Sequence, residues 1–184
     1  MSDAVSDTVL DARVCLDRYL SWHPDAVARL AALALQLKEE PHSITRRSNM
    51  RGHLTASALV LSPDLSEVLM IDHLALNARL PAGGHADEGR KLREEALREN
   101  VEETGVSEIS PVGPSPLDVD THPIPANPKK GEGDHFHHDF MFAFIARSRD
   151  IPVPQLQEVA DCMWVPIAEA RKDPRIDRAL NCVV

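Results

Sequence analysis

The sequence predicts an α+β domain with a helical extension at its N-terminus. Over residues 8–40, apolar side chains recur at three- and four-residue spacing, which indicates two helices. Four segments with the apolar composition of strands follow at residues 53–61, 68–71, 136–145 and 159–165. A charged stretch over residues 90–104 interrupts these strands and indicates one more helix. We therefore expect residues 1–45 to form the extension and residues 46–184 to form the main domain.

The extension is predicted to hold one helix before Pro24 and a second helix between Pro24 and Pro41. Their apolar stripe consists of Leu16, Tyr19, Leu20, Val27, Leu30, Ala31, Ala34 and Leu37. Such a stripe suits packing on the main domain or on a second copy of the chain, so a homodimer is one expected arrangement.

Turn and cap residues mark where the predicted strands and helices of the main domain begin and end. A turn at residues 62–64 joins the first two strands into a hairpin. Residues 80–85 break the strand pattern, and Gly105 follows the charged helix where a left-handed C-terminal cap belongs. Residues 111–135 contain six prolines and three glycines, which predicts a long loop that serves as a lid or a substrate wall.

The strand over residues 136–145 alternates between two faces. One face carries Phe136, Phe140, Phe142 and Phe144, and the other carries His137, Asp139, Met141 and Ala143. We expect one of these faces to belong to the core. After the last strand, Pro166 is predicted to open a short helix, and Asp173 with Pro174 to begin a terminal one.

The composition excludes several classes of partner. Lys and Arg number 20 against 29 Asp and Glu, which gives a net charge of -9 and a pI of about 5.4. This charge opposes binding to nucleic-acid polymers and to anionic membranes. Three scattered cysteines form no disulfide framework, the acidic start lacks a signal-peptide pattern, and the longest apolar run covers residues 30–35. We therefore expect a soluble, cytoplasmic protein.

The charged helix gathers acidic residues on one face. On a helical wheel, these acids fall within about 100° of one another: Glu95, Glu99, Glu102 and Glu103. Like charges at this spacing destabilise a helix by about 0.2–0.5 kcal/mol per pair, and a divalent cation removes that cost. Mg²⁺ and Mn²⁺ prefer such oxygen ligands. The alternative interpretation is a solvated face on which Arg98 pairs with neighbouring acids and no metal binds.

Two glycines precede this helix. Gly83 and Gly84 allow the backbone to approach an ion or a phosphate closely. The segment that contains them leads toward a helix N-terminus, where amide groups and the helix dipole favour anions. A glycine pair alone is a weak signal, but beside the acids it favours a site for metal and phosphate.

Together, the glycines and acids resemble the Nudix box. The segment reads Gly84-x13-Arg98-Glu99-x2-Glu102-Glu103-x-Gly105-Val106, which agrees in spacing with the family pattern from the first glycine to the last aliphatic residue. Two positions differ, because Arg90 stands where the family has its first Glu and Asn100 where it has an aliphatic residue. Residues 53–58 and 164–166 are also similar to Nudix domains, so the resemblance covers roughly residues 50–170.

The resemblance implies a fold and an activity. The fold is an α/β/α sandwich with a mixed sheet, and the activity is Mg²⁺-dependent hydrolysis of a diphosphate bond in a nucleoside diphosphate linked to another moiety. Glu99, Glu102 and Glu103 would act as catalytic residues that hold one or more Mg²⁺ ions. The backbone carbonyl of Gly84 would help to hold the metal, and Arg98 would orient the acids. Mn²⁺ is a possible substitute.

The two departures bear on different properties. Asn100 is expected to point away from the acidic face and to weaken packing by about 1 kcal/mol. Arg90 reverses a charge near the phosphate position, so it contacts a substrate phosphate, or else Glu88 or Glu95 takes the place of the missing Glu. This departure leaves an alternative function open: a catalytically weak or inactive Nudix-like module that binds a nucleotide diphosphate.

The histidines and the predicted loop suggest how a substrate is bound. His85 follows Gly84 directly, His137 lies on a strand, and Lys129 is a cation in an acidic chain, so we assign all three to substrate binding with Arg90. Residues 120–139, which include a His-x-His-x-Asp run, resemble a bacterial Nudix subgroup whose substrate is unsettled.

The same run has other interpretations. His135, His137 and Asp139 share one face of the strand, so they form a second metal site or, in the alternative that we favour, polar and hydrogen-bonding groups of a phosphate pocket. A cupin-like metal oxygenase built on these three residues is a further hypothesis, but it leaves the acidic helix unexplained.

Several residues are candidates for the general base of the reaction, and two are candidates for stacking on the nucleobase of a substrate. Glu103, Glu158 and the acids of residues 118–139 all compete for the role of general base. Phe136 and Trp164 are the candidates for stacking, and either could belong to the core instead.

Overall fold

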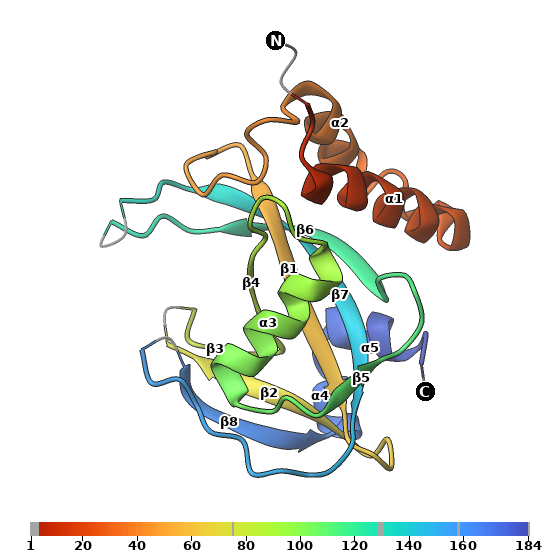
Figure 1. Cartoon of the computed structure of the whole chain (residues 1–184), viewed down its shortest axis with the longest axis vertical. Helices are drawn as coiled ribbons and strands as arrows, with labels where there is room; N and C mark the ends of the chain where they lie inside the picture. Colours follow the sequence, from red (N-terminus) through yellow and green to blue (C-terminus); the bar gives the residue numbers. More distant parts are fainter. Residues whose placement is uncertain (1–3, 75, 129–130, 158, 184) are drawn as a thin grey trace.

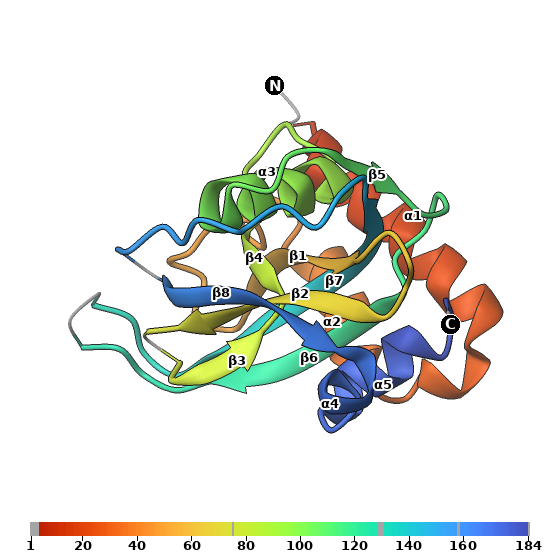
Figure 2. The same ribbon diagram turned by 90° about the horizontal axis from the view of Figure 1, so that it is seen from below.

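The computed structural model describes residues 4–74, 76–128, 131–157 and 159–183. In this part of the chain, one eight-stranded sheet lies between helices on its two faces (Figures 1 and 2). This arrangement confirms the predicted α+β class and the α/β/α sandwich. Among the described helices, none has both the length and the apolar character that crossing a bilayer demands.

The sheet is mixed, as predicted. Its strands are β1 (His53–Leu61), β2 (Glu67–His73), β3 (Ala78–Leu80), β4 (Ala82–His85), β5 (Ile109–Pro111), β6 (Asp118–Ile124), β7 (His135–Ala146) and β8 (Val159–Pro166). The main path is β3-β2-β1-β7-β5, with β4 paired to β1, β6 to β7 and β8 to β2. Strands β1 and β7 run parallel, and the other pairs run antiparallel.

The central strand β1 positions the site because its two edges have different neighbours. All nine of its residues are buried, as expected for a strand that is covered on both faces. One edge pairs with β7 over the whole length of β1. The other edge pairs first with β4 and then, at its last two residues, with β2. This division brings Gly83 and Gly84 of β4 beside Ser57 and Ala56 of β1.

The helices form two layers around two main hydrophobic clusters. The helices are α1 (Asp7–Trp22), α2 (Ala31–Glu39), α3 (Leu92–Thr104), α4 (Ile167–Ala170) and α5 (Pro174–Leu180). Residues of α1, α2 and α3 share a cluster with Leu54 and Phe140 of the sheet. Residues of α4 and α5 pack with Leu59 and Met141 in the second cluster. Figure 2 shows α3 on one side of the sheet and α4 and α5 on the other.

The N-terminal extension packs on the main domain through only part of the predicted stripe, because Leu16, Tyr19, Leu30 and Leu37 are buried whereas Val27, Ala31 and Ala34 are exposed. Val9, Leu16 and Leu33 are buried in the cluster that also holds core residues of the sheet. The second helix begins at Ala31 instead of directly after Pro24, because a short 3-10 helix, η1 (Pro24–Ala26), comes first. The division of the chain after residue 45 and the homodimer stay predictions.

Polar contacts fix α1 to the segment that leads into α3. The Thr8 hydroxyl lies 2.9 Å from the carbonyl oxygen of Asp87 and 2.8 Å from that of Arg90. Asp11 Oδ2 accepts a hydrogen bond of 2.9 Å from the N–H of Leu92, the first residue of α3. The extension therefore supplies an acceptor for a backbone N–H at the start of the acidic helix that has no partner within the helix.

Two expectations about loops are wrong. Residues 111–135 do not form one long loop, because they contain β6, which pairs with β7 over its whole length. Pro123 is tolerated there because β6 lies at an edge of the described sheet and pairs with β7 alone. Residues 80–85 likewise hold the end of β3 and all of β4, whose glycines allow close packing on β1.

Other local predictions are confirmed. The first two strands form a hairpin, and Gly105 ends α3 in the left-handed conformation with φ of 70°. The carboxylate of Asp173 accepts hydrogen bonds from two backbone N–H groups at the start of α5. Three of the four phenylalanines of β7 are buried, while Phe136 at its start is 45% exposed.

Candidate active site

The glycines of β4 lie against the acidic face of α3. The N–H of Gly83 donates to Glu103 Oε2 at 2.9 Å. A Cβ atom on Gly84 would lie 2.4 Å from the Glu99 carboxyl group, far inside van der Waals contact. Glycine is therefore required for this approach of backbone and carboxylate. The segment leads into α3, as expected, and the pair itself contacts the middle and the C-terminal half of that helix.

Arg98 holds the neighbouring acids in place. Its guanidinium donates to Glu95 Oε2 at 2.8 Å, to Glu99 Oε1 at 2.6 Å and to Glu102 Oε2 at 2.7 Å. Burial opposes its charge, but the hydrogen bonds to Glu95 and Glu102 raise its pKa overall. These contacts fit the orienting role that the sequence implies for Arg98.

The acids differ in burial. The side chain of Glu95 is fully buried and that of Glu99 is 13% exposed, whereas that of Glu102 is 54% exposed. Glu103 is also buried. Burial raises the pKa of Glu99, although the charge of Arg98 opposes the rise. The carboxylates near Gly84 are therefore poorly hydrated and crowded.

The donor set fits a hard divalent cation. Carboxylates of Glu99 and Glu103 converge on the Gly83-Gly84 backbone, and a missing side chain on Gly84 keeps the space beside Glu99 clear. Oxygen donors of this kind suit Mg²⁺ and Mn²⁺ better than softer metals. The Oε1 atom of Glu95 has no hydrogen-bond partner among the described residues, and Arg90 Nη1 lies 3.8 Å from it.

A cleft opens beside Glu99 and Gly84. Its charged and imidazole lining includes Arg47, His85, Glu99, His122, His137 and Arg175. Glu103 lies behind Gly83 and outside this lining, and Glu102 extends toward solvent while it contacts Arg98. Of the box acids, Glu99 is thus the one at the wall of the cleft.

Asp139 also lines the cleft, but its carboxylate is fully engaged. Its oxygens accept hydrogen bonds from Thr55 Oγ1 at 2.8 Å and Ser57 Oγ at 2.5 Å, and Arg175 of α5 pairs with it. Burial alone would raise the pKa of Asp139, but Arg175 and the Ser57 hydrogen bond lower it overall. Asp139 therefore anchors β7 to β1 and α5.

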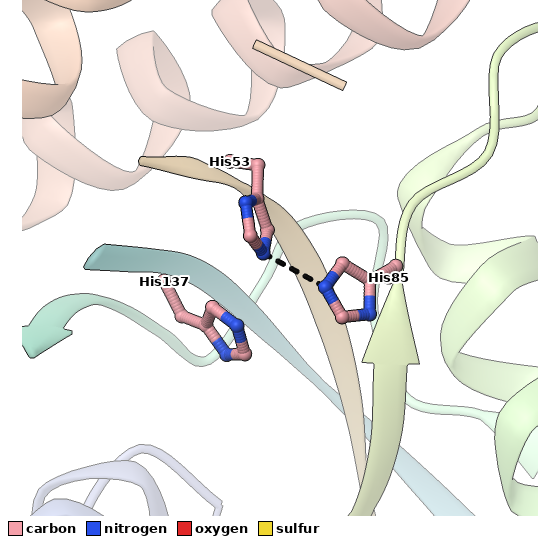
Figure 3. Close-up of side chains that lie close together, drawn as sticks. All are labelled: His53, His85 and His137. Carbon is pink, nitrogen blue, oxygen red and sulfur yellow. Dashed lines mark hydrogen bonds between the residues drawn. The ribbon is translucent and has the colours of Figure 1, made fainter. Parts of the chain in front are cut away.

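A cluster of imidazole rings lies in the same region. Figure 3 shows that His53 of β1, His85 of β4 and His137 of β7 point toward one another, with one possible ligand nitrogen from each within 4.8 Å of the others. His53 Nε2 and His85 Nε2 are 2.7 Å apart. His135 Nε2 lies 3.3 Å from His137 Nε2 at the edge of this group.

Burial keeps these imidazoles neutral. Burial is the main cause that lowers the pKa of His53 to about 4 and that of His137 to about 3. His85 behaves alike, since burial and then the nearby Arg47 charge lower its pKa to about 2. At neutral pH each ring therefore offers one N–H donor and one lone pair.

A sequence profile described as the NUDIX domain matches residues 51–181. The chain belongs to the Nudix family. This assignment, together with the helices on both sides of the mixed sheet, excludes the cupin-like hypothesis. Family membership supports hydrolysis of a pyrophosphate-type bond as the general class of activity. No curated protein matches the chain in a sequence search.

Solved Nudix structures share the fold at low sequence identity. A NUDIX-family hydrolase from Clostridium perfringens aligns with a TM-score of 0.55 and 16% identity, over 73% of this chain and 96% of that chain. The dihydroneopterin triphosphate pyrophosphohydrolase of E. coli aligns with a TM-score of 0.56 and 13% identity, over 70% and 92% of the two chains. RenU, a Nudix hydrolase from M. smegmatis, aligns with a TM-score of 0.51 and 14% identity, over 71% of this chain and 83% of that chain. At these identities, the similarity concerns the fold.

The structure places the two departures from the Nudix box in different settings. Asn100 is fully buried, and its Nδ2 donates to the carbonyl of Val106 at 2.7 Å, while its Oδ1 has no hydrogen-bond partner among the described residues. Arg90 is half-exposed and lies beside Glu95, outside the lining of the cleft. Its contact with a substrate phosphate stays a prediction.

The other predicted groups are spread over the Nudix fold. Lys129 and Glu158 lie outside the described residues. His85 and His137 line the cleft, as a role in substrate binding requires. Trp164 Nε1 donates to the carbonyl of Asp150, and its side chain packs against the core cluster.

Sequence reasoning missed three residues of this Nudix site. His53 was noted only as part of a flanking segment, although the β1–β7 register places it directly opposite His137. Arg47 and Arg175 come from a turn and from α5, and both line the cleft. No spacing in the sequence connects Arg175 with Asp139, so tertiary packing alone identifies that pair.

Proposed function

We propose that the chain hydrolyses a diphosphate bond in a small phosphate-containing molecule, a nucleoside diphosphate linked to another moiety, with the help of Mg²⁺. The observation that carries this proposal is the contact between Gly84 and Glu99, in which a largely buried carboxylate lies against bare backbone at the wall of a cleft. Membership of the Nudix family supports the class of reaction.

The acids of α3 are proposed to hold the metal. Glu99, Glu102 and Glu103 supply carboxylate oxygens, and Gly84 supplies a backbone carbonyl. When bound, Mg²⁺ or Mn²⁺ neutralises charge on pyrophosphate oxygens and lowers the pKa of a bound water. Arg98 contributes by fixing the orientation of its carboxylate partners through charge-assisted hydrogen bonds.

Other groups of the cleft are proposed to bind the substrate. Arg175 is engaged by Asp139, so we assign Arg47 as the guanidinium that pairs with a substrate phosphate. His85 and His137 line the same cleft and, as neutral rings, offer N–H donors to phosphate oxygens. The contacts of Arg90 and Lys129 with phosphate belong to the same proposal.

A second candidate function is a Nudix module that binds a nucleotide diphosphate without cleaving it. Arg90 supports this candidate, because a cation stands where the family has an acid, and its guanidinium lies beside Glu95. The two functions differ in turnover and agree in binding, so one experiment separates them.

The setting that we propose is the cytoplasm. Cys15, Cys162 and Cys182 are free thiols, which suits a reducing compartment. The net charge of -9 favours a small substrate over a nucleic-acid polymer or a membrane surface.

The test is the release of nucleotide products, measured by chromatography, from a panel of nucleoside triphosphates, nucleotide sugars and dinucleoside polyphosphates, with Mg²⁺ and with EDTA. Turnover of at least one compound that requires Mg²⁺ would support the enzyme. Binding without turnover, measured by calorimetry on the same panel, would favour the module. Neither binding nor turnover across the panel would contradict both candidates.

A further inference from the structure

We propose that His53, His85 and His137 form a second metal site, separate from the acids of α3, for a transition-metal dication such as Zn²⁺. Three strands bring these rings together: β1, β4 and β7 (Figure 3). One ring nitrogen from each lies within 4.8 Å of the other two. The sheet register fixes the arrangement, because His53 pairs with His137 across β1 and β7, and His85 lies opposite Thr55 on the other edge of β1.

The donor chemistry selects the class of metal. Imidazole nitrogens suit Zn²⁺, Co²⁺, Ni²⁺ and Cu²⁺, whereas Mg²⁺ and Ca²⁺ prefer oxygen. Three histidines and one open position form a common arrangement at zinc sites that also bind a water or a substrate. His53 is buried, whereas His85 and His137 line the cleft, so the open position faces the substrate side.

Neighbouring groups support the ligand geometry. His53 Nδ1 lies 3.4 Å from the carbonyl oxygen of Asn49, which leaves Nε2 to face the other rings. His122, whose ring centroid is 5.8 Å from that of His137, has its Nδ1 3.1 Å from Asp120 Oδ2. A carboxylate behind an imidazole is the usual support for a metal ligand. His135 lies nearer, with its ring centroid 5.1 Å from that of His137 and its Nδ1 2.7 Å from the carbonyl oxygen of Gly133, so both rings are supported candidates for a fourth position.

The short contact between His53 and His85 is a hydrogen bond that a metal ion would replace. Their Nε2 atoms, 2.7 Å apart, cannot both present lone pairs to each other, so one carries a proton in the metal-free chain. Around a tetrahedral Zn²⁺ with bonds of 2.0–2.1 Å, two nitrogens lie about 3.3 Å apart. Metal binding at both Nε2 atoms therefore requires this proton to move, through solvent, to Nδ1 of the same ring, and it separates the two nitrogens by about 0.6 Å.

This imidazole cluster is distinct from the acidic site although both border one cleft. Strand β4 connects them, because Gly84 contacts Glu99 and the next residue, His85, contacts His53. A transition metal here would lie beside the proposed Mg²⁺ and bind an additional oxygen of the substrate. The competing interpretation, rings that serve only as hydrogen-bond donors, is an outcome of the test.

The first experiment uses Co²⁺ as a spectroscopic probe on the metal-free full chain. A four- or five-coordinate nitrogen site gives strong visible absorption, whereas six-coordinate oxygen ligation gives almost none. We expect strong absorption that saturates at one Co²⁺ per chain and disappears when Zn²⁺ is added. Absence of this absorption overturns the proposal without the need for any variant.

Variants then locate the ion by Zn²⁺ calorimetry. Replacing His137 or His85 by Gln should weaken Zn²⁺ binding by more than about 100-fold, since loss of a ligand exceeds the 10- to 100-fold effect of an outer contact. The exposed His42→Gln is the matched control, and E99Q should keep the affinity of the wild type. His53 is left unchanged in these variants because it is buried, and circular dichroism confirms folding.

Two outcomes overturn the assignment. Zn²⁺ affinity that is unchanged in both folded variants, H85Q and H137Q, would show that the rings are only hydrogen-bond donors. Zn²⁺ affinity that falls in E99Q but not in these two would place the ion among the acids of α3. The E99Q result also separates this site from the proposed hydrolase, because Mg²⁺-dependent turnover is lost in E99Q whether or not the imidazole cluster binds metal.

Discussion

The acidic face of α3 and the imidazole cluster of β1, β4 and β7 border the same cleft, but they are built in opposite ways. The acids come from one helix, and Arg98 of that helix orients three of them. The imidazoles come from three strands that meet only in the folded sheet. Oxygen donors gather in the first region and nitrogen donors in the second, so we expect each to select its own class of metal.

Strand β4 is where the two regions meet. Gly84 lies against Glu99, and His85, the next residue, lies against His53. A change on α3 should therefore affect the acidic region alone, whereas a change in β4 should affect both. The variants below use this difference.

The largest effect is expected for Glu103→Gln. The substitution keeps the shape of a side chain that accepts the Gly83 N–H but removes a negative charge from the proposed metal site. We expect kcat/KM for the best substrate of the panel to fall by about 10³-fold, or about 4 kcal/mol. Glu94→Gln on the exposed side of the same helix is the control and should change the rate less than twofold. Equal rates for both variants would contradict the role of Glu103.

Gly84→Ala should disturb the acidic region and the imidazole cluster together. The new methyl group would lie 2.4 Å from the Glu99 carboxyl carbon, so the carboxylate or β4 must shift. We expect kcat/KM to fall by about 100-fold, whereas the free energy of unfolding should fall by less than about 1 kcal/mol, because the group that moves is the flexible end of Glu99. Both are measured against Gly133→Ala, whose methyl group would have its nearest neighbour, Met50, at 3.8 Å. A Gly84→Ala variant with the kcat/KM of the wild type would contradict the need for this close approach of backbone and carboxylate.

Arg98→Lys should have a smaller effect that is confined to the acids. Lysine keeps the positive charge but cannot donate to three carboxylates from one planar group. We expect kcat/KM to fall by about 10- to 100-fold and the Mg²⁺ concentration for half-maximal rate to rise. Zn²⁺ binding to the imidazole cluster should not change. Arg93→Lys, one turn earlier on α3, is the matched control.

The smallest effect concerns pH and the histidine beside the cluster. His138 is buried, and burial lowers its pKa from 6.5 to about 4. Its stabilising contribution is complete above pH 6.5 and is lost as the pH falls toward 4, because the unfolded state then binds more protons. Between pH 7 and pH 5, metal-free wild type should lose about 1–2 kcal/mol more stability than His138→Gln. Urea titrations at both pH values measure the free energy of unfolding. Equal losses of stability in the two proteins would argue against the lowered pKa of His138.

The same contrast explains what the sequence could predict. Glu99, Glu102 and Glu103 stand at helical spacing, so their shared face follows from local geometry, as does the Gly105 cap. The meeting of His53 with His137 depends on the parallel register of β1 and β7, which no local pattern specifies. The same holds for Arg175 on Asp139 and for the contact of Gly84 with Glu99.

The errors in the predicted fold also have physical causes. Prolines over residues 111–135 suggested a loop, but an edge strand tolerates Pro123, and Val119 of that strand is buried in the core cluster. Asn100 was expected to weaken packing only, yet its Nδ2 binds the carbonyl of Val106 just after the helix. In both cases, a contact made only in the folded chain, with β7 or with the carbonyl of Val106, determines the role of the residue.

The central claim is that the acids of α3 hold a divalent cation on which hydrolysis depends. The most direct measurement is the rate of hydrolysis of the best panel substrate by chain stripped with EDTA, before and after Mg²⁺ is restored, in wild type and in E99Q. We predict no measurable rate without metal, recovery in wild type when Mg²⁺ is added, and no recovery in E99Q. A rate that persists without metal, or an E99Q variant that recovers as fully as wild type, would contradict the claim.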